Sequence, residues 1–186
     1  MAFQDYTLIQ APMAGGLSTA DVVAGASRAG ALGSVGAGYL SGDAIMAAAD
    51  GVRAAGGDAF AINLFIPAQR DATDAEWRAA LKALAPCYRQ GEVPLPDHFP
   101  KLPDFREQFD AMLEARPAVF SWTFGRLPRS MMAACRARGI TLVGTATSRD
   151  EALALAGDGV DGIVLQGEGA TWILTTRISS NTPRPS

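Results

Sequence analysis

The chain has 186 residues, a formal net charge of -3, 48% hydrophobic residues and 19% charged residues. This composition excludes a wholly disordered chain, and the slight excess of acidic residues excludes a broad basic surface for nucleic acid. The two cysteines, Cys87 and Cys135, are too few for a disulfide framework and fit a reducing compartment. No apolar run reaches the ~20 residues of a membrane span, and the N-terminus lacks the basic start of a signal peptide. We therefore expect one domain that is soluble and cytoplasmic.

The first half of the chain alternates short apolar runs with amphipathic stretches. The apolar runs predict strands at residues 7–13, 31–35 and 59–65, and the amphipathic stretches predict helices at 20–29, 44–55 and 75–85. Thr19 is a plausible N-cap of the first helix, and Pro86 is expected to stop the third. Residues 86–104 hold five of the eleven prolines, which predicts an excursion outside the core.

The same alternation continues after this Pro-rich insertion. Helices are expected at 105–116, 129–138 and 149–157, and strands at 118–124, 140–147 and near 160–167. Strands that are apolar throughout are typical of parallel sheets covered on both faces, so repeated βα units predict a doubly wound sheet or a (β/α)8 barrel. About six parallel strands are too few for a complete barrel, which takes ~250 residues. Residues 169–186 do not form another βα unit and are expected to be a disordered tail, although WILTT is compatible with a strand.

Small or uncharged polar residues follow each predicted strand, at the edge where parallel βα folds bind ligands. Amide and hydroxyl groups of this kind suit a flat, neutral heteroaromatic ligand and suit a metal ion poorly, so we expect no metal site. The only histidine, His98, lies in the insertion and is expected to be a solvated surface residue. No GxGxxG fingerprint is present, and isolated glycines and threonines at these positions are also compatible with ordinary turns and caps.

Six segments together resemble the nitronate monooxygenases, also called 2-nitropropane dioxygenases, over residues 5–168. They are QAPMAGGLST, GALGSVGAGYLS, FAINLFIP, FSWTFGRLP, GTATSRDEALAL and GIVLQGE. The resemblance implies an oxidoreductase with an FMN-binding TIM barrel, whose substrates are alkyl nitronates and O2. It also implies that the cofactor-binding residues are Ala11, Pro12, Met13, Asn63, Thr123, Thr145, Gln166 and Gly167.

One departure from the family pattern follows the Gln166-Gly167 pair. The family continues there with Ala-Gly-Gly-His, which supplies the catalytic base, whereas this chain continues with ATWILTTRISSNTPRPS. No catalytic residue is therefore assigned. We expect residues 1–168 to form an incomplete barrel that holds flavin weakly and turns over slowly, with open sheet edges through which the chain could self-associate. Two alternatives stay open: a relative of the flavin-dependent enoyl reductases, and a non-catalytic remnant or half-barrel subunit.

Overall fold

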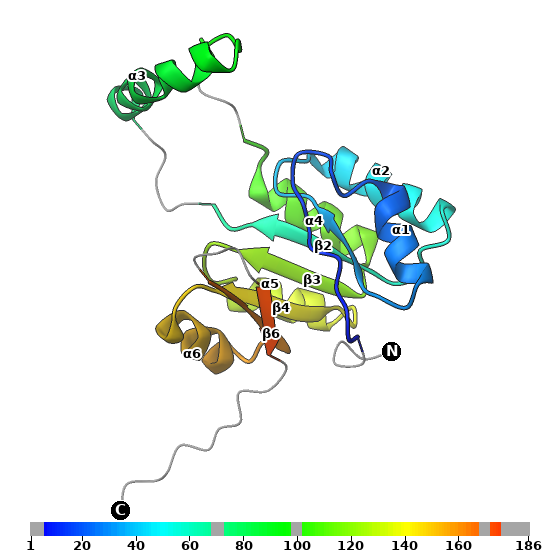
Figure 1. Ribbon diagram of the computed structural model, residues 1–186. Coiled ribbons are helices and arrows are strands. Elements are labelled where there is room, and N and C mark those ends of the chain that lie inside the picture. The colour runs from blue at the N-terminus through cyan, green and yellow to red at the C-terminus, as the bar shows by residue number, and fades with distance from the viewer. Residues whose placement is uncertain (1–5, 68–72, 98–101, 168–171, 176–186) are drawn as a thin grey trace, which may run out of the picture. The chain divides into compact units, whose positions relative to one another are not determined.

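The computed structural model describes residues 6–67, 73–97, 102–167 and the backbone of 172–175. The chain divides into two compact units, one made of residues 1–66 with 103–186 and the other of residues 67–102. The larger unit contains one six-stranded sheet in the order β1-β2-β3-β4-β5-β6 (Figure 1). The strands are β1 (Gly33–Gly36), β2 (Phe60–Phe65), β3 (Val119–Thr123), β4 (Thr141–Ala146), β5 (Gly162–Gln166) and β6 (Trp172–Thr175).

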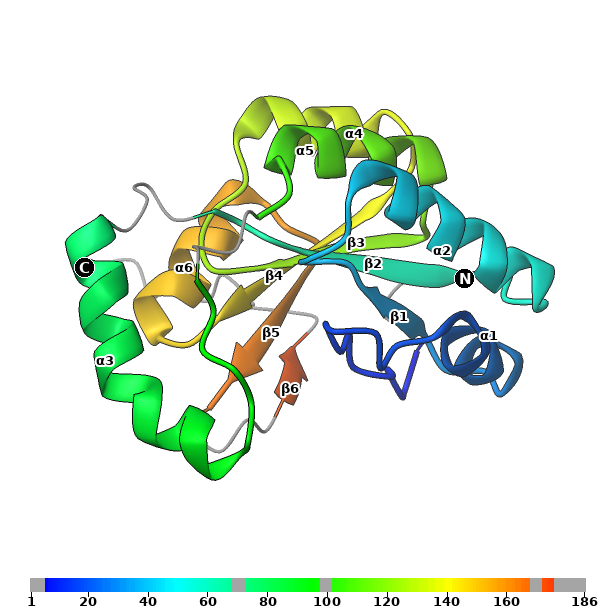
Figure 2. The ribbon, with the colours of Figure 1, turned by 90° about the horizontal axis from the view of Figure 1, so that it is seen from above.

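Strands β1 to β5 are parallel, and β6 pairs antiparallel with β5. The helices of this unit surround the outer face of the curved sheet and leave its concave face without a helix among the described residues (Figure 2). These helices are α1 (Ala20–Arg28), α2 (Gly42–Ala54), α4 (Phe105–Ala115), α5 (Arg129–Arg136) and α6 (Arg149–Asp158). The sheet does not close, which confirms the prediction of an incomplete TIM-type barrel, but five strands are parallel where about six were expected, and the sixth is antiparallel.

The main core lies between the sheet and these helices. Alternate residues of the strands point into it, among them the fully buried Ile62, Phe120 and Trp122. Helix α1 packs directly on β1, since a Cβ at Gly33 would lie 2.2 Å from the carbonyl oxygen of Val23. Burial of such large side chains contributes roughly 1.5–3 kcal/mol each, so this layer stabilises the open sheet.

The helix starts follow the local sequence signals. Thr19 caps α1 as predicted, and Ser148 caps α6 through its hydroxyl, which accepts from the backbone N–H of Glu151 at 3.3 Å. Such caps can be predicted from the local sequence, because the N-cap side chain bonds to a backbone N–H in the first turn of the same helix.

Two secondary-structure predictions were wrong. The segment 7–13 is not a strand but a single parallel bridge between Ile9 and Leu32. The helix in the smaller unit, α3 (Asp74–Gln90), continues through Pro86 instead of ending there. Proline removes one helix hydrogen bond, which is tolerable here because α3 has no buried residues and water can solvate the freed carbonyl. In the part of the chain that the structure describes, no helix has the length and apolar character needed to span a membrane.

Candidate functional site

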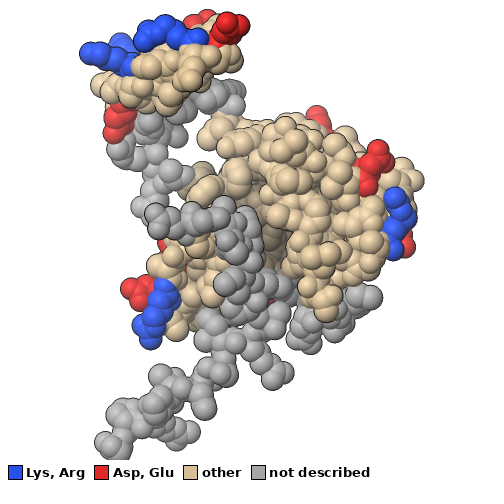
Figure 3. Space-filling view, viewed as in Figure 1, with Lys and Arg blue, Asp and Glu red and all other residues tan. Residues whose placement is uncertain are grey.

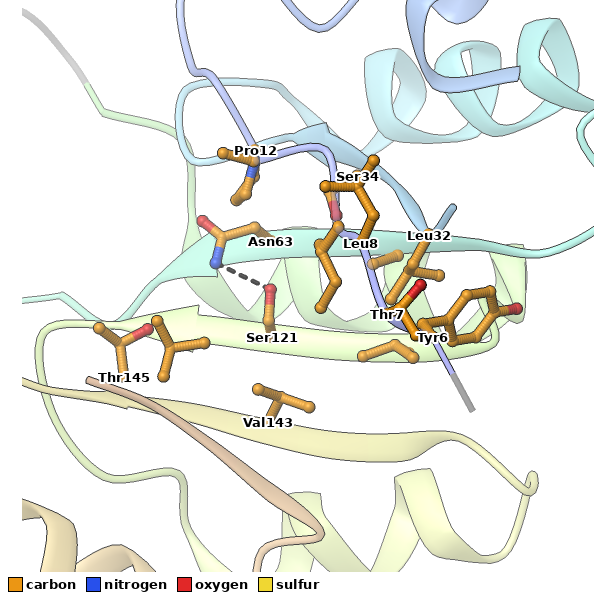
Figure 4. Close-up of a pocket in the computed structure, with 15 residues that line it drawn as sticks. Tyr6, Thr7, Leu8, Pro12, Leu32, Ser34, Asn63, Ser121, Val143 and Thr145 are labelled. Atoms are coloured by element: carbon orange, nitrogen blue, oxygen red, sulfur yellow. Dashed lines mark hydrogen bonds between the residues drawn. The ribbon is translucent and has the colours of Figure 1, made fainter. Parts of the chain in front are cut away.

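The concave face of the sheet carries two rows of side chains at different heights. Nearer the amino ends of the strands, Leu32, Ala61, Val119 and Val143 form a small apolar cluster separate from the main core. Two residues further along each of β1 to β4, the side chains become polar. This polar row consists of Ser34, Asn63, Ser121 and Thr145 (Figure 4). Residues two apart on a strand share a face, so the polar row lies directly above the apolar one toward the carboxyl ends.

Both rows line one pocket of about 470 Å³. The N-terminal segment forms a further part of its wall. The described lining residues are Tyr6, Thr7, Leu8, Ile9, Ala11, Pro12, Leu32, Ser34, Ala61, Asn63, Val119, Ser121, Val143, Thr145 and Val164. A pocket of this size with an apolar floor and a few hydrogen-bonding groups is typical of a small-molecule or cofactor site.

Asn63 is the most constrained polar group of the site. Its side chain is 4% exposed, and its Nδ2 donates to Ser121 Oγ at 3.0 Å (Figure 4). Its Oδ1 has no hydrogen-bond partner among the described residues. Every fully buried side-chain polar atom described does have a partner, so this oxygen must be accessible, and the pocket lies beside it. The site therefore offers a fixed acceptor to a ligand donor.

The loop of residues 11–18 crosses the carboxyl end of β1. A Cβ at Gly36 would lie 2.5 Å from the carbonyl carbon and oxygen of Met13, so glycine is needed for this close approach. Ser18 Oγ accepts from the backbone N–H of Met13 at 2.9 Å and from Gln10 Nε2 at 3.2 Å. Neither Gln10 nor Ser18 was predicted to have a role, although both lie within the QAPMAGGLST motif.

Four of the eight residues assigned to the cofactor lie together in the pocket: Ala11, Pro12, Asn63 and Thr145. They come from the N-terminal segment, β2 and β4, which are far apart in the sequence. The parallel arrangement brings them together because the carboxyl ends of neighbouring strands meet at one edge.

The other four assigned residues are not among the lining residues. Met13 is 38% exposed, Thr123 is buried at the end of β3, Gln166 is half-buried at the end of β5 and Gly167 is exposed. His98 lies outside the described residues, so its expected solvation stays a prediction.

The described lining of the pocket contains no Asp, Glu, Lys, Arg or His. On the larger unit, the charged atoms visible in Figure 3 lie toward its outer margin. The described residues also contain no group of three or more His, Cys, Asp or Glu that could hold a metal ion. The arrangement therefore favours binding of an uncharged part of a ligand over binding of a metal ion.

The ionisable groups with shifted pKa values lie elsewhere. Hydrogen bonds from the backbone and side chain of Thr147 lower the pKa of Glu151, and the Arg126 guanidinium lowers the pKa of Asp158. Burial raises the pKa of Cys135 to about 11, so this thiol is not a nucleophile. None of these groups lines the pocket, and none is placed to act as its acid or base.

An open parallel βα sheet with helices on its outer face and a neutral pocket on its concave face defines an incomplete barrel of the TIM type. Residues 2–171 match the nitronate monooxygenase family, and the chain belongs to that family.

A probable nitronate monooxygenase of Staphylococcus aureus strain Newman is 34% identical over 169 residues, which are 89% of this chain and 47% of the relative. A nitroalkane oxidase structure from Streptomyces ansochromogenes has a TM-score of 0.77 and 30% identity, covering 89% of this chain and 48% of that one. FabK from Thermotoga maritima, at 16% identity, 87% and 40% coverage and a TM-score of 0.61, shares the fold. The chain spans about half the length of the curated relatives it matches.

Proposed function

We propose that this chain forms the flavin-ring side of an active site that oxidises alkyl nitronates with O2. The observation that carries the proposal is the polar row of Ser34, Asn63, Ser121 and Thr145 inside an otherwise apolar pocket, in a chain of the nitronate monooxygenase family. FMN, when bound, would supply the redox chemistry between nitronate and oxygen. The chain's own contribution is to bind and orient the ring.

The residues present fit a flat, neutral ring. The apolar cluster provides a floor, and Ala11 and Pro12 provide a wall without polar side chains. Asn63 Oδ1 is an acceptor without a partner in the part of the chain that the structure describes, and the hydroxyl of Thr145 can donate or accept. By family resemblance we assign Met13, Thr123, Gln166 and Gly167 to the surroundings of the same ring.

The phosphate of FMN does not find an equivalent partner in the pocket. Among the described lining residues there is no lysine or arginine, and the lining comes from strands and the N-terminal segment rather than from a helix N-terminus. We therefore propose that this polypeptide binds the ring of riboflavin about as tightly as that of FMN.

We further propose that the 186-residue polypeptide alone turns over slowly. Its only histidine is His98, which lies outside the described residues, and the described lining of the pocket contains no carboxylate, lysine or histidine that could act as a base. Loss of a general base typically costs a factor of ~10²–10⁴ in rate.

Fluorescence titration of the purified chain with riboflavin and with FMN tests the ring site. We expect the two dissociation constants to agree within about threefold, because the phosphate contributes little here.

Thr145→Val keeps the shape of the side chain and removes its hydroxyl, and Asn63→Leu removes the amide. Both variants should weaken riboflavin binding by about tenfold, the loss of one hydrogen bond, whereas Gln90→Leu at the end of α3 should not. Failure of the unmodified chain to bind riboflavin would refute the ring site.

Oxygen uptake tests the reaction class. Propane-2-nitronate should give slow uptake above the flavin-only background, and the neutral 2-nitropropane should give less. An enoyl thioester with a reduced nicotinamide serves as the second substrate, with oxidation of the nicotinamide followed by absorbance, because the sequence is also compatible with an enoyl reductase. Preference for that substrate would overturn the nitronate assignment.

A further inference from the structure

The parallel pairing of the N-terminal segment stops abruptly after Gln10. Leu32 N donates to the carbonyl of Leu8 at 3.0 Å, and Gln10 N donates to the carbonyl of Leu32 at 2.9 Å. A regular parallel ladder would continue with Ser34 N donating to the Gln10 carbonyl and with residue 12 donating to the Ser34 carbonyl. Residue 12 is proline and has no N–H, so the second of these bonds cannot form.

The side chain of Gln10 replaces the first of these two hydrogen bonds. Its Oε1 accepts from Ser34 N at 2.9 Å, where the ladder would have used a backbone carbonyl. Its Nε2 donates to Ser18 Oγ at 3.2 Å and to the carbonyl of Ala11. Ser18 Oγ in turn accepts from Met13 N at 2.9 Å. One side chain therefore ties the start and the end of the loop to β1.

We infer that Gln10 is a positioning residue that holds the loop of residues 11–18 over the pocket. Releasing the backbone from the ladder lets the chain turn across β1 and bring Ala11 and Pro12 to the pocket wall. The Gln10 side chain satisfies the freed N–H of Ser34, which is buried and would otherwise be left without a partner. The consequence for ligand binding rests on the proposed function, whereas the role in fixing the loop does not.

Amide hydrogen exchange of the 15N-labelled full chain tests the positioning role without any ligand. Gln10→Met keeps a similar volume and removes all three hydrogen bonds of the side chain, so the Ser34 amide should exchange about tenfold faster or more. Ser18→Ala should accelerate exchange at Met13 but not at Ser34, and Ser18→Thr, which keeps the hydroxyl, should restore protection at Met13. Gln90→Met, at the exposed end of α3, is the control and should change neither amide.

Riboflavin titration of the same variants separates positioning from mere structural support. Gln10→Met should weaken riboflavin binding about tenfold, while unchanged chemical shifts of the β3 and β4 amides show that the sheet itself is intact. Unchanged exchange at Ser34 in Gln10→Met would overturn the inference. Faster exchange with unchanged riboflavin affinity would also overturn it, because the loop would then be free without consequence. If the unmodified chain binds no riboflavin, the proposed function fails and the exchange rates alone decide the role of Gln10.

Discussion

Replacing Gly36 with alanine puts a methyl group where the loop of residues 11–18 crosses β1. The new Cβ would lie 2.5 Å from Met13 C and O and 2.7 Å from Ala14 N, well inside the 3.4 Å at which ordinary contact begins. The neighbours are backbone atoms, so relief requires the loop to move by about 0.9 Å relative to the strand, a typical overpacking strain. We expect the free energy of unfolding to fall by ~1–3 kcal/mol and riboflavin binding to weaken at least tenfold.

Substitutions at two further glycines serve as controls, because they lie away from the loop of residues 11–18. Gly33→Ala clashes with the Val23 carbonyl at 2.2 Å, so it should destabilise the chain by disturbing α1, on the face away from the pocket. Gly25→Ala lies within α1 with its nearest neighbour, Arg28 Nη2, at 3.9 Å, and should stabilise the chain by ~0.5–1 kcal/mol. Urea unfolding and riboflavin titration are measured for all three. Retention of both stability and riboflavin affinity in Gly36→Ala would refute the placement of the loop.

Three other predictions concern the fold outside the pocket. Gln108 Nε2 donates to the carbonyls of residues 37, 38 and 40 in the loop after β1, at 2.7–3.4 Å. Gln108→Leu removes this donor and should lower the free energy of unfolding, measured in urea, by ~1–3 kcal/mol. Arg126 lowers the pKa of Asp158. Their ion pair therefore stabilises the fold fully at pH values above the unfolded-state pKa of about 3.9. This contribution is lost as the pH falls through the lower pKa of the folded state. The stability difference between the unmodified chain and Asp158→Asn should therefore shrink toward zero in acid. Iodoacetamide at neutral pH should label the exposed Cys87 in the native chain and reach the buried Cys135, whose pKa burial raises to about 11, only in urea.

Contrary results would be clear in each case. An unchanged free energy of unfolding in Gln108→Leu would mean that the loop carbonyls find other donors. A stability difference for Asp158→Asn that grows in acid would contradict the direction of its pKa shift. Rapid labelling of two thiols in the folded chain would contradict the burial of Cys135.

Features that depend on neighbouring residues were predictable from the sequence. Thr19 and Ser148 bond within their own first turns, so their caps were visible as local patterns. The strands β2 to β5 were visible as short apolar runs bounded by glycine or polar residues. Asn63 was assigned to the cofactor by the family resemblance, and the parallel order of the strands explains why it lies in one pocket with Pro12 and Thr145.

Features that depend on pairing partners were not predictable. The segment 7–13 has the composition of a strand, but Pro12 and the Gln10 side chain end its ladder after one bridge. Ser34 was missed because it lies inside an apolar run, and only the register with β2 shows that it shares the concave face with Asn63. Pro86 was predicted to stop a helix, but α3 continues through it, and because α3 has no buried residues water can solvate the carbonyl that loses its donor.

Chemical-shift mapping tests the central claim most directly. The 15N-labelled chain is titrated with riboflavin, and each amide is followed. The largest changes should fall on the polar row of the concave face, at Ser34, Asn63, Ser121 and Thr145, with the outer helices α5 and α6 unaffected. Changes confined to those helices or to α3, with the polar row unmoved, would contradict a ring site on the concave face.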